Sequence, residues 1–324
     1  MIIYSLHLLK TTRMRKVKWT GVYPAVTTKF KSNGDLDIPM FLKNIEFQTE
    51  AGVDGIIIGG SLGESSTITH DERLTLTQVA LEAFGDKIDV IMNVAEGATE
   101  KAIELVKAAD AIGVHGFMLL PPMMYKPTEQ EVADYIKAVA TSTESPIMLY
   151  NNPVDYKIEI TLGIFEQLIP LKNIQAVKES TRDISNVTRL KNAFGGRFKI
   201  LCGVDTLAME ELLMGADGWV AGLVDAFPAE TVAIYRLVKA GRIDEALQIY
   251  RWFLPILELD ISPQLVQNIK LAEVITGIGT EDVRPPRQVL TGEERKRVLD
   301  ILEKGMATRP KLPDYLSIEV DSVI

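Results

Sequence analysis

Residues 174–180, Ile174-Gln175-Ala176-Val177-Lys178-Glu179-Ser180, combine a short apolar run with a lysine at its end. Near-continuous apolar runs of this length are typical of strands buried on both faces, as in parallel sheets. A lysine that ends such a strand places its amine at the edge of an apolar interior, where desolvation lowers the pKa and frees the amine for attack on a carbonyl. The alternative is a lysine whose head group reaches water, and the strand alone favours this alternative.

Seven further apolar runs resemble residues 174–178 in length and composition, at residues 22–28, 55–59, 89–94, 116–120, 147–151, 198–202 and 218–222. Amphipathic stretches of helical period alternate with them, at residues 38–50, 71–84, 99–111, 129–141, 160–168, 184–193 and 206–214. Strands and helices in such strict alternation predict an α/β fold of the (β/α)8 TIM-barrel type. An open doubly wound sheet is the alternative, but it rarely needs so many evenly spaced units.

The pattern becomes entirely helical after Pro228, with helices predicted at residues 230–239, 244–254, 264–276 and 293–306. Pro255 is expected to end or kink the second of these helices, because proline cannot donate the backbone hydrogen bond of a helix interior. The predicted organisation is an N-terminal extension at residues 1–18, the barrel at 19–227, a C-terminal helical bundle at 228–308, and a tail at 309–324 that lies outside the core.

The first residues of the chain do not follow the pattern of a secretory signal. Residues 1–9 are apolar and basic residues follow at Arg13, Arg15, Lys16 and Lys18, whereas a signal peptide has its positive charge first. The apolar run is also too short to span a bilayer. We interpret this segment as an extension outside the fold or as the result of an over-long start assignment, with Met14 as the alternative start.

Charge and composition exclude several classes of function. The 324 residues include 44 acidic and 35 basic side chains, a formal charge of −9, so nucleic acids and anionic membranes are poor partners. The single cysteine, Cys202, cannot form an intramolecular disulfide and is expected to be an inert buried thiol, which favours a cytoplasmic location. Only 3 histidines occur, which disfavours a clustered metal site. Catalysis is therefore expected from lysine, hydroxyl, carboxylate or backbone groups.

Reactive groups in such barrels sit at the carboxyl ends of the strands. The second predicted strand runs into Gly59-Gly60-Ser61-Leu62-Gly63-Glu64-Ser65, where backbone N–H groups and the Ser61 hydroxyl could hold a carboxylate, unless the loop is a plain glycine turn. The fifth strand ends in Tyr150-Asn151-Asn152-Pro153, where the tyrosine is either a proton relay or a packing residue. Because Tyr150 and Lys178 end consecutive strands, we expect them to be neighbours at the barrel rim.

Three motifs in this order resemble the dihydrodipicolinate synthase / N-acetylneuraminate lyase family, the Schiff-base class I aldolase barrels. They are Gly60-Ser61-Leu62-Gly63-Glu64, Tyr150-Asn151-Asn152-Pro153 and Val177-Lys178-Glu179-Ser180. The resemblance implies that Lys178 forms an imine with the substrate and that Tyr150 relays protons. It implies that Ser61 and the Leu62 backbone hold the carboxylate of a small-molecule acid, pyruvate or another 2-oxo acid. A homotetramer, and no cofactor beyond the covalent lysine imine, are implied as well.

Departures from the synthase pattern bear on the substrate. Leu62 stands where the synthase has threonine, and Met123 and Met124 stand where it has paired tyrosines. Asp155 stands at or near the place of an arginine that binds the carboxylate of the aldehyde substrate, and this reversal of charge disfavours a lysine-pathway synthase. The predicted catalytic residues are Lys178 and Tyr150, and the predicted substrate-binding residues are Gly60, Ser61, Leu62, Asn152, Asp155, Met124 and Gly222.

Three further segments resemble a branch of the family associated with hydroxyproline catabolism: Lys178-Glu179-Ser180-Thr181-Arg182-Asp183, Cys202-Gly203-Val204-Asp205 and Arg251-Trp252-Phe253. The resemblance implies a Δ1-pyrroline-4-hydroxy-2-carboxylate deaminase, with Asn152 or Asp155 near the 4-hydroxyl of the substrate. The alternatives are 4-hydroxy-tetrahydrodipicolinate synthase, a sugar-acid or sialic-acid aldolase or dehydratase, and a non-catalytic barrel that binds a small acid. A metal-dependent aldolase is disfavoured by the scattered histidines.

Two charged residues receive structural interpretations. A carboxylate beside a glycine turn is commonly a backbone acceptor or a helix cap, and we expect this of Glu64. Lys270 lies on a helical pattern and is expected at the surface or at an interface. Neither is expected to bind substrate.

Overall fold

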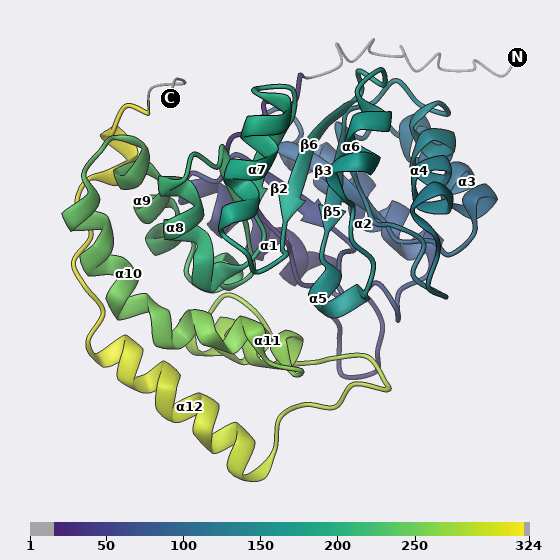
Figure 1. Cartoon of the computed structure of the whole chain (residues 1–324). Coiled ribbons are helices and arrows are strands. Elements are labelled where there is room, and N and C mark those ends of the chain that lie inside the picture. Colours follow the sequence, from purple (N-terminus) through teal and green to yellow (C-terminus); the bar gives the residue numbers. More distant parts are fainter. Residues whose placement is uncertain (1–15, 321–324) are drawn as a thin grey trace, which may run out of the picture.

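The computed structural model describes residues 16–320, and the predictions for residues 1–15 and 321–324 lie outside this range. Within it, eight parallel strands form a central sheet that helices surround (Figure 1). Each of the predicted apolar runs overlaps one strand: β1 (Gly21–Pro24), β2 (Gly55–Ile58), β3 (Asp89–Val94), β4 (Gly116–Leu119), β5 (Ile147–Asn151), β6 (Ile174–Glu179), β7 (Lys199–Cys202) and β8 (Gly218–Ala221). The predicted TIM barrel is confirmed.

The sheet closes on itself between its first two strands. The strand order is β1-β8-β7-β6-β5-β4-β3-β2, so β1 pairs with β8 as a closed barrel requires. The remaining seam between β1 and β2 is joined by the Val26 N–H, which donates to the Ile57 carbonyl at 3.1 Å. β1 ends earlier than predicted because the Thr27 N–H turns to the Asp225 side chain, at 3.1 Å, rather than to a neighbouring strand.

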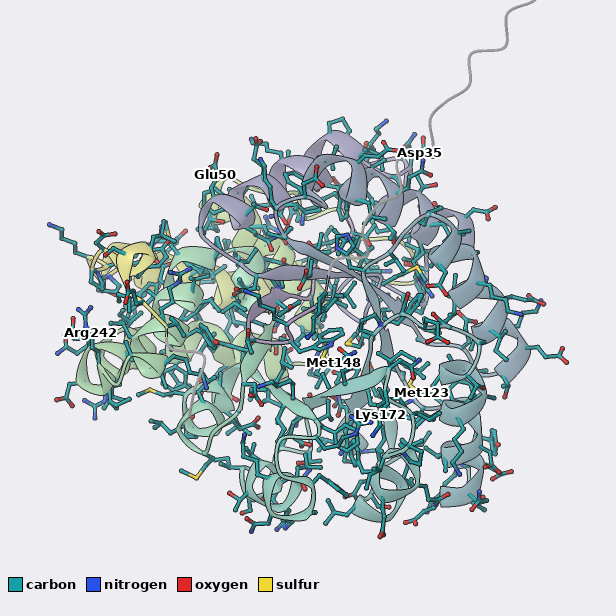
Figure 2. All side chains as sticks on the ribbon, turned by 90° about the horizontal axis from the view of Figure 1, so that it is seen from above. Asp35, Glu50, Met123, Met148, Lys172 and Arg242 are labelled. Atoms are coloured by element: carbon teal, nitrogen blue, oxygen red, sulfur yellow. The ribbon has the colours of Figure 1, made fainter. Side chains whose placement is uncertain are left out.

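Side chains of the strands fill the inside of the barrel. All the residues of β1 through β5 are buried, as expected for strands that face the barrel interior on one side and helices on the other. Seen from above, Met148 of β5 lies toward the middle of the molecule, whereas the exposed Glu50 and Arg242 lie at its edge (Figure 2).

The helices between the strands follow the predicted pattern. They are α1 (Ile38–Glu50), α2 (His70–Phe84), α3 (Thr99–Ala111), α4 (Glu129–Ala140), α6 (Leu162–Leu168), α7 (Ser185–Phe194) and α8 (Ala208–Leu213). Thr128 and Glu131 form the capping box that begins α4. The short helix α5 (Pro153–Tyr156) was not predicted; the Asn152 side chain caps it and Pro153 occupies its first turn.

Helix α9 (Pro228–Lys239) packs against β1 and β8. It therefore completes the ring of barrel helices instead of starting the C-terminal bundle. The predicted boundary at residue 227 falls one helix too early. The last strand of a TIM barrel is followed by a helix that covers the seam with the first strand, and this rule places α9 with the barrel.

The C-terminal unit consists of α10 (Ile243–Leu257), α11 (Leu265–Thr276) and α12 (Gly292–Ala307), which lie together at one side of the barrel (Figure 1). A short 3-10 helix, η3 (Glu258–Ile261), connects α10 to α11. The predicted break at Pro255 is wrong, because α10 continues to Leu257. Pro255 is exposed and lies in the last turn, where water can satisfy the carbonyl that loses its partner. Among residues 16–320, no helix has the length and apolarity that crossing a bilayer requires.

The predicted tail packs on the barrel rather than lying outside the core. The Arg309 guanidinium binds the buried Glu230 carboxylate of α9, with Nη2 and Oε2 3.0 Å apart. Arg236 of α9 donates to the Leu316 carbonyl at 3.0 Å, and Tyr315 packs against the core. Arg309 and Arg236 each bond to a residue about eighty positions away in the sequence, and these bonds hold the tail on the barrel. No local sequence pattern predicts such a pairing.

The start of the described chain also belongs to the core. Val17 and Trp19 are buried, and the Trp19 ring stacks on Tyr23 with ring centroids 6.0 Å apart. The Trp19 Nε1–H donates to the Gln175 side chain at 3.1 Å, which ties the entry of the chain to β6. The predicted extension therefore ends before Val17 and not after residue 18.

Lys270 and Glu64 form a buried ion pair between α11 and the loop that follows β2. Their Nζ and Oε1 atoms are 2.6 Å apart and both side chains are fully buried. The other oxygen of Glu64 accepts the Arg284 N–H at 3.1 Å. The expectation that Lys270 lies at the surface is wrong, and Glu64 is an ion-pair partner as well as a backbone acceptor. A second fully buried pair, Lys29 with Glu273 at 2.8 Å, also joins α11 to the barrel.

We predict that Lys270→Met lowers the free energy of unfolding by about 3–5 kcal/mol, because it leaves the buried Glu64 carboxylate with only the more distant Arg287 guanidinium, 3.9 Å away, as a counter-charge. Urea denaturation followed by circular dichroism measures this loss. The control is Lys296→Met at an exposed position of α12, for which we expect a change within about 0.5 kcal/mol. The double variant Glu64→Gln/Lys270→Met is expected to be more stable than Lys270→Met alone. A Lys270→Met loss as small as that of the control would contradict the role of the pair.

Candidate active site

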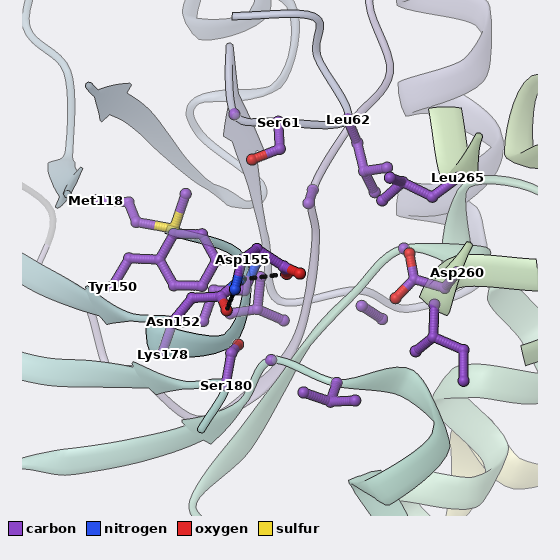
Figure 3. Close-up of a pocket in the computed structure, with 18 of the residues that line it drawn as sticks. Ser61, Leu62, Met118, Tyr150, Asn152, Asp155, Lys178, Ser180, Asp260 and Leu265 are labelled. Carbon is purple, nitrogen blue, oxygen red and sulfur yellow. Dashed lines mark hydrogen bonds between the residues drawn. The ribbon is translucent and has the colours of Figure 1, made fainter. Parts of the chain in front are cut away.

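A pocket opens at the carboxyl ends of the strands, between the barrel and the C-terminal unit, with a volume of roughly 600 Å³ including its open mouth. The loop after β2 and the ends of β5, β6, β7 and β8 form its walls, and η3 and α11 close one side (Figure 3). The structure brings together all but one of the predicted site residues: Gly60, Ser61, Leu62, Tyr150, Asn152, Asp155, Lys178 and Gly222.

Lys178 occupies the base of the pocket on β6. It is in register with Tyr150 of β5, and its Nζ atom lies 4.2 Å from the centroid of the Tyr150 ring. The side chain is almost fully buried, and within the described range its amine has no ion-pair partner. Burial lowers the pKa of this amine below the ordinary lysine value. The arrangement favours the neutral, nucleophilic form that imine chemistry requires.

Asn152 fixes the hydroxyl of Tyr150. Its Nδ2 atom donates to the Tyr150 oxygen at 3.1 Å and to Asp155 Oδ2 at 2.8 Å, while its Oδ1 atom accepts the Asp155 N–H and caps α5. Burial raises the pKa of Tyr150 to about 12, and the hydrogen bond from Asn152 opposes this shift. Tyr150 is thus a neutral phenol that can give up its proton only transiently. Asn152 is a positioning residue whose polar atoms are already occupied.

Tyr156 is a site residue that the sequence analysis missed. Its hydroxyl is hydrogen-bonded to Ser61 Oγ, and its ring meets Tyr150 edge-on, with centroids 5.7 Å apart and planes at 84°. Burial raises the pKa of Tyr156 to about 12. The second phenol supplies a hydroxyl near the place where Leu62 removes one. The Asn152-Pro153 start signal of α5 could have indicated the helix that carries Tyr156, but not where its side chain lies.

The loop after β2 is shaped to receive an anion. Gly59 has a left-handed backbone, φ +71°, and a Cβ there would lie 3.0 Å from the Arg73 side chain. Beyond it, the Ser61 and Leu62 N–H groups donate to no other protein group in the described part of the chain. Together with the Ser61 hydroxyl they can bind a carboxylate. Glu64 holds a left-handed backbone, φ 55°, at the end of this turn, where its ion pair with Lys270 fixes it.

Asp260 of η3 is the second site residue that the sequence did not indicate. It lines the pocket from the C-terminal unit, on the side opposite Lys178 (Figure 3). A Cβ on Gly222 would lie 2.6 Å from Asp260 Oδ1 and 3.0 Å from Leu62 Cδ1, so the glycine leaves room for both side chains. Burial raises the pKa of Asp260 well above that of an ordinary carboxyl group.

Arg182 changes the electrostatics expected around Asp155. It lines the pocket in the turn after β6, with φ 60°, and its Nη2 atom lies 3.5 Å from Asp155 Oδ1. Both side chains are about half exposed. A guanidinium is therefore present beside the carboxylate that replaces the synthase arginine, and the local charge is balanced rather than simply reversed.

The sequence carries the signature of a known family over most of its length. The Dihydrodipicolinate synthetase family matches residues 18–305. The chain belongs to this family. It is thereby an enzyme, a lyase of the class I aldolase type.

Curated relatives of this dihydrodipicolinate synthetase-family enzyme match it nearly end to end. The 4-hydroxy-tetrahydrodipicolinate synthase of Moorella thermoacetica is 28% identical over 288 residues, which cover 89% of this chain and 99% of the relative. A protein of the same name from Leptospira biflexa is 30% identical over 291 residues, covering 88% and 99%.

Solved structures agree with these relatives. The 4-hydroxy-tetrahydrodipicolinate synthase of Methylacidiphilum fumariolicum SolV superposes with a TM-score of 0.85 at 30% identity, covering 89% of this chain and 96% of that one. YagE, a prophage protein of the dihydrodipicolinic acid synthase family from E. coli K12 solved in complex with pyruvate, gives a TM-score of 0.84 at 26% identity, covering 90% and 99%.

Met124 is the predicted site residue that the structure of this family member does not bring to the pocket. Its side chain is 85% exposed and lies in the loop after β4, against Gly97. The loop turns outward beside α4, whereas Met118 of β4 lines the pocket in its place. A strand position points a side chain inward by its alternation, while a loop position such as Met124 carries no such constraint.

Gly203 gives a direct test of the pocket geometry. A Cβ at this position would lie 2.7 Å from Lys178 Cε, and still closer to Ser180 Oγ. We predict that Gly203→Ala displaces the lysine and lowers the rate of borohydride trapping with pyruvate by about tenfold or more, since a small misplacement of reacting atoms has large kinetic effects. Mass spectrometry of the adduct measures the rate.

The matched control is Gly196→Ala, where a Cβ has no neighbour within 4 Å. It should trap pyruvate at the wild-type rate. Thermal melts of both variants separate a local displacement from unfolding. Normal trapping in a folded Gly203→Ala protein would rule out the tight packing of Gly203 against Lys178.

Proposed function

We propose that this enzyme is a Schiff-base lyase or hydro-lyase in which the Lys178 amine adds to C2 of a small 2-oxo acid or of the corresponding cyclic imine. The observation that supports this most directly is the buried amine of Lys178, without an ion-pair partner in the described chain and 4.2 Å from the Tyr150 ring centroid. The imine is the electron sink of the reaction, and it requires no separate cofactor.

Tyr150 is the proposed proton relay. Addition of Lys178 to the C2 carbonyl gives a carbinolamine, whose hydroxyl leaves as water with the proton of the Tyr150 phenol. The resulting phenolate then takes a proton from C3, which converts the imine to its enamine and restores the phenol. Tyr156 and Ser61 extend this hydroxyl chain to the loop after β2, where the free N–H groups of Ser61 and Leu62 hold the substrate carboxylate.

Δ1-pyrroline-4-hydroxy-2-carboxylate deaminase is the proposed specific activity. Lys178 adds to C2 of the cyclic imine and the ring opens, which releases the ring nitrogen as an amine on C5. Water is then eliminated across C3 and C4, and the double bond shifts to C4 and C5, which gives an enamine that tautomerises to the C5 imine. Hydrolysis of this imine and of the Lys178 imine yields ammonia, 2-oxoglutarate semialdehyde and the free enzyme. The apolar Leu62 and the Asp155 carboxylate support a substrate other than that of the synthase. A homotetramer and a cytoplasmic location are part of this proposal and rest on the family resemblance and the composition.

A second candidate is 4-hydroxy-tetrahydrodipicolinate synthase, the name carried by relatives that match nearly the whole chain. Arg182 favours it, because a guanidinium at the pocket could bind the second carboxylate. Leu62 and Asp155 disfavour the synthase activity.

A paired assay separates the two activities. We predict that the purified enzyme releases ammonia from the pyrroline substrate and does not condense pyruvate with aspartate semialdehyde. Glutamate dehydrogenase coupling measures the first reaction and dihydrodipicolinate reductase coupling the second. Condensation without ammonia release would establish the synthase instead. Release of pyruvate from a sugar acid or a sialic acid would indicate an aldolase.

Lys178→Met tests the imine itself. We predict that it abolishes borohydride trapping with pyruvate, whereas Lys172→Met at an exposed position leaves trapping intact.

Loss of the buried Lys178 amine, which lacks an ion-pair partner, should also raise the melting temperature of the Lys178→Met variant. Because burial lowers the pKa of Lys178, the unfolded wild-type chain binds more protons between the lowered and the ordinary value. Wild-type stability therefore rises with pH across this window, and the variant should lack that rise. A trapped adduct in Lys178→Met would move the imine to another lysine, whereas a wild-type protein that traps no pyruvate would indicate a non-covalent binder.

A further inference from the structure

The carboxyl group of Asp260 faces the pocket without a protein partner. It is contributed by η3, outside the barrel, and in the described structure it enters no hydrogen bond or ion pair (Figure 3). On the barrel side it lies close to Gly222, where a Cβ would be 2.6 Å from its Oδ1 atom. A polar group aimed into the pocket, with nothing to bind in the protein, is available to the substrate.

The other carboxyl and amide groups around the pocket are already engaged, while the Ser180 hydroxyl, which also lines it, has no partner in the described chain. Asn152 holds Tyr150 and caps α5, and Asp155 binds Asn152 and Arg182. Asp205 accepts hydrogen bonds from Trp219 and from the N–H groups of Gly222 and Leu223 at 2.8–3.2 Å, so its carboxylate is fully bound. Asp260 alone among these carboxyls retains both oxygens for a ligand.

The charges around Asp260 favour its protonated form. Burial raises its pKa well above the ordinary value and the nearby Asp205 and Asp155 raise it further, while Lys178 and Arg182 oppose the shift. Lys178 itself is held toward the neutral amine by burial. A neutral carboxyl group can donate a hydrogen bond and then a proton to an oxygen of the substrate.

We propose that Asp260 is a catalytic acid that protonates the departing C4 hydroxyl of the imine-bound substrate. This inference rests on the proposed function and narrows it to elimination of water from 4-hydroxy-2-oxo acids or their cyclic imines. In the step, the enamine nitrogen pushes its electron pair to re-form the C2 imine, and the C2–C3 pair becomes the C3–C4 double bond. The C4–O bond breaks toward oxygen, which takes the proton of Asp260 and leaves as water. Solvent then returns a proton to the Asp260 carboxylate.

A protonated Asp260 cannot itself serve as the base for cleavage between C3 and C4. An aldol cleavage needs a base that removes the proton of the C4 hydroxyl, and a protonated carboxyl group cannot accept it. Asp260 thereby separates two reactions that begin from the same lysine imine.

Asp260→Asn is the test, because it keeps shape and removes the transferable proton. We expect ammonia release from Δ1-pyrroline-4-hydroxy-2-carboxylate to fall by about 100-fold or more, the usual worth of a general acid. Elimination from the analogue with fluorine at C4 should fall far less, since fluoride leaves without a proton. Exchange of the pyruvate methyl protons in heavy water, which involves no leaving group, reports the earlier steps. Asp300→Asn, at an exposed position of α12, is the control, and thermal melts verify the fold.

The proposal is overturned if Asp260→Asn retains the wild-type rate with the hydroxyl substrate, or if it loses equal activity with the fluoro analogue, which would indicate a merely structural role. If the wild type traps pyruvate but eliminates water or fluoride from neither substrate, the role of Asp260 is overturned, while imine formation at Lys178 is supported. A wild-type protein that traps no pyruvate overturns the proposed function and the role of Asp260 together.

Discussion

The burial of one lysine amine is the constraint on which the site depends. Lys178 has no ion-pair partner in the described chain, and burial shifts the pKa of its amine downward, although Tyr156 and the carboxyl groups of Asp260 and Asp205 oppose this shift. That burial requires a glycine at position 203, because any side chain there would collide with the lysine. It also requires the register of β5 with β6, which sets Tyr150 beside Lys178. The reactivity of the amine is therefore a property of the barrel and not of the lysine alone.

The C-terminal unit is a wall of this site rather than an attachment to it. Lys270 and Glu273 of α11 reach into the barrel and pair with Glu64 and Lys29 in fully buried contacts. Buried ion pairs cost much desolvation energy and add little net stability, but removing one partner lowers the free energy of unfolding strongly. Their effect is to fix the orientation of η3, and with it Asp260, against the glycine-rich loop.

Local patterns predicted the strands, most of the helices and the central pair, Tyr150 and Lys178, because each depends on periodicity or on the ends of strands. Four side chains lie where local patterns did not place them. Asp260 and Lys270 come from the C-terminal unit, and nothing near them in sequence points to a pocket. Tyr156 lies on a single turn of helix, too short for a periodic signal, and Met124 lies in a loop whose direction no pattern specifies.

The buried ion pairs of α11 limit how the barrel and the C-terminal unit can be recombined during evolution. If the barrel were separated after α9, Lys29 and Glu64 would be left as lone charges in an apolar interior, and the pocket would lose the side that carries Asp260. The two units therefore cannot be exchanged independently by recombination, although each has its own set of helices. A change in the reaction that such an enzyme catalyses would therefore arise from point substitutions in η3 or in the loops at the barrel rim, while Lys178 at the base of the pocket is retained.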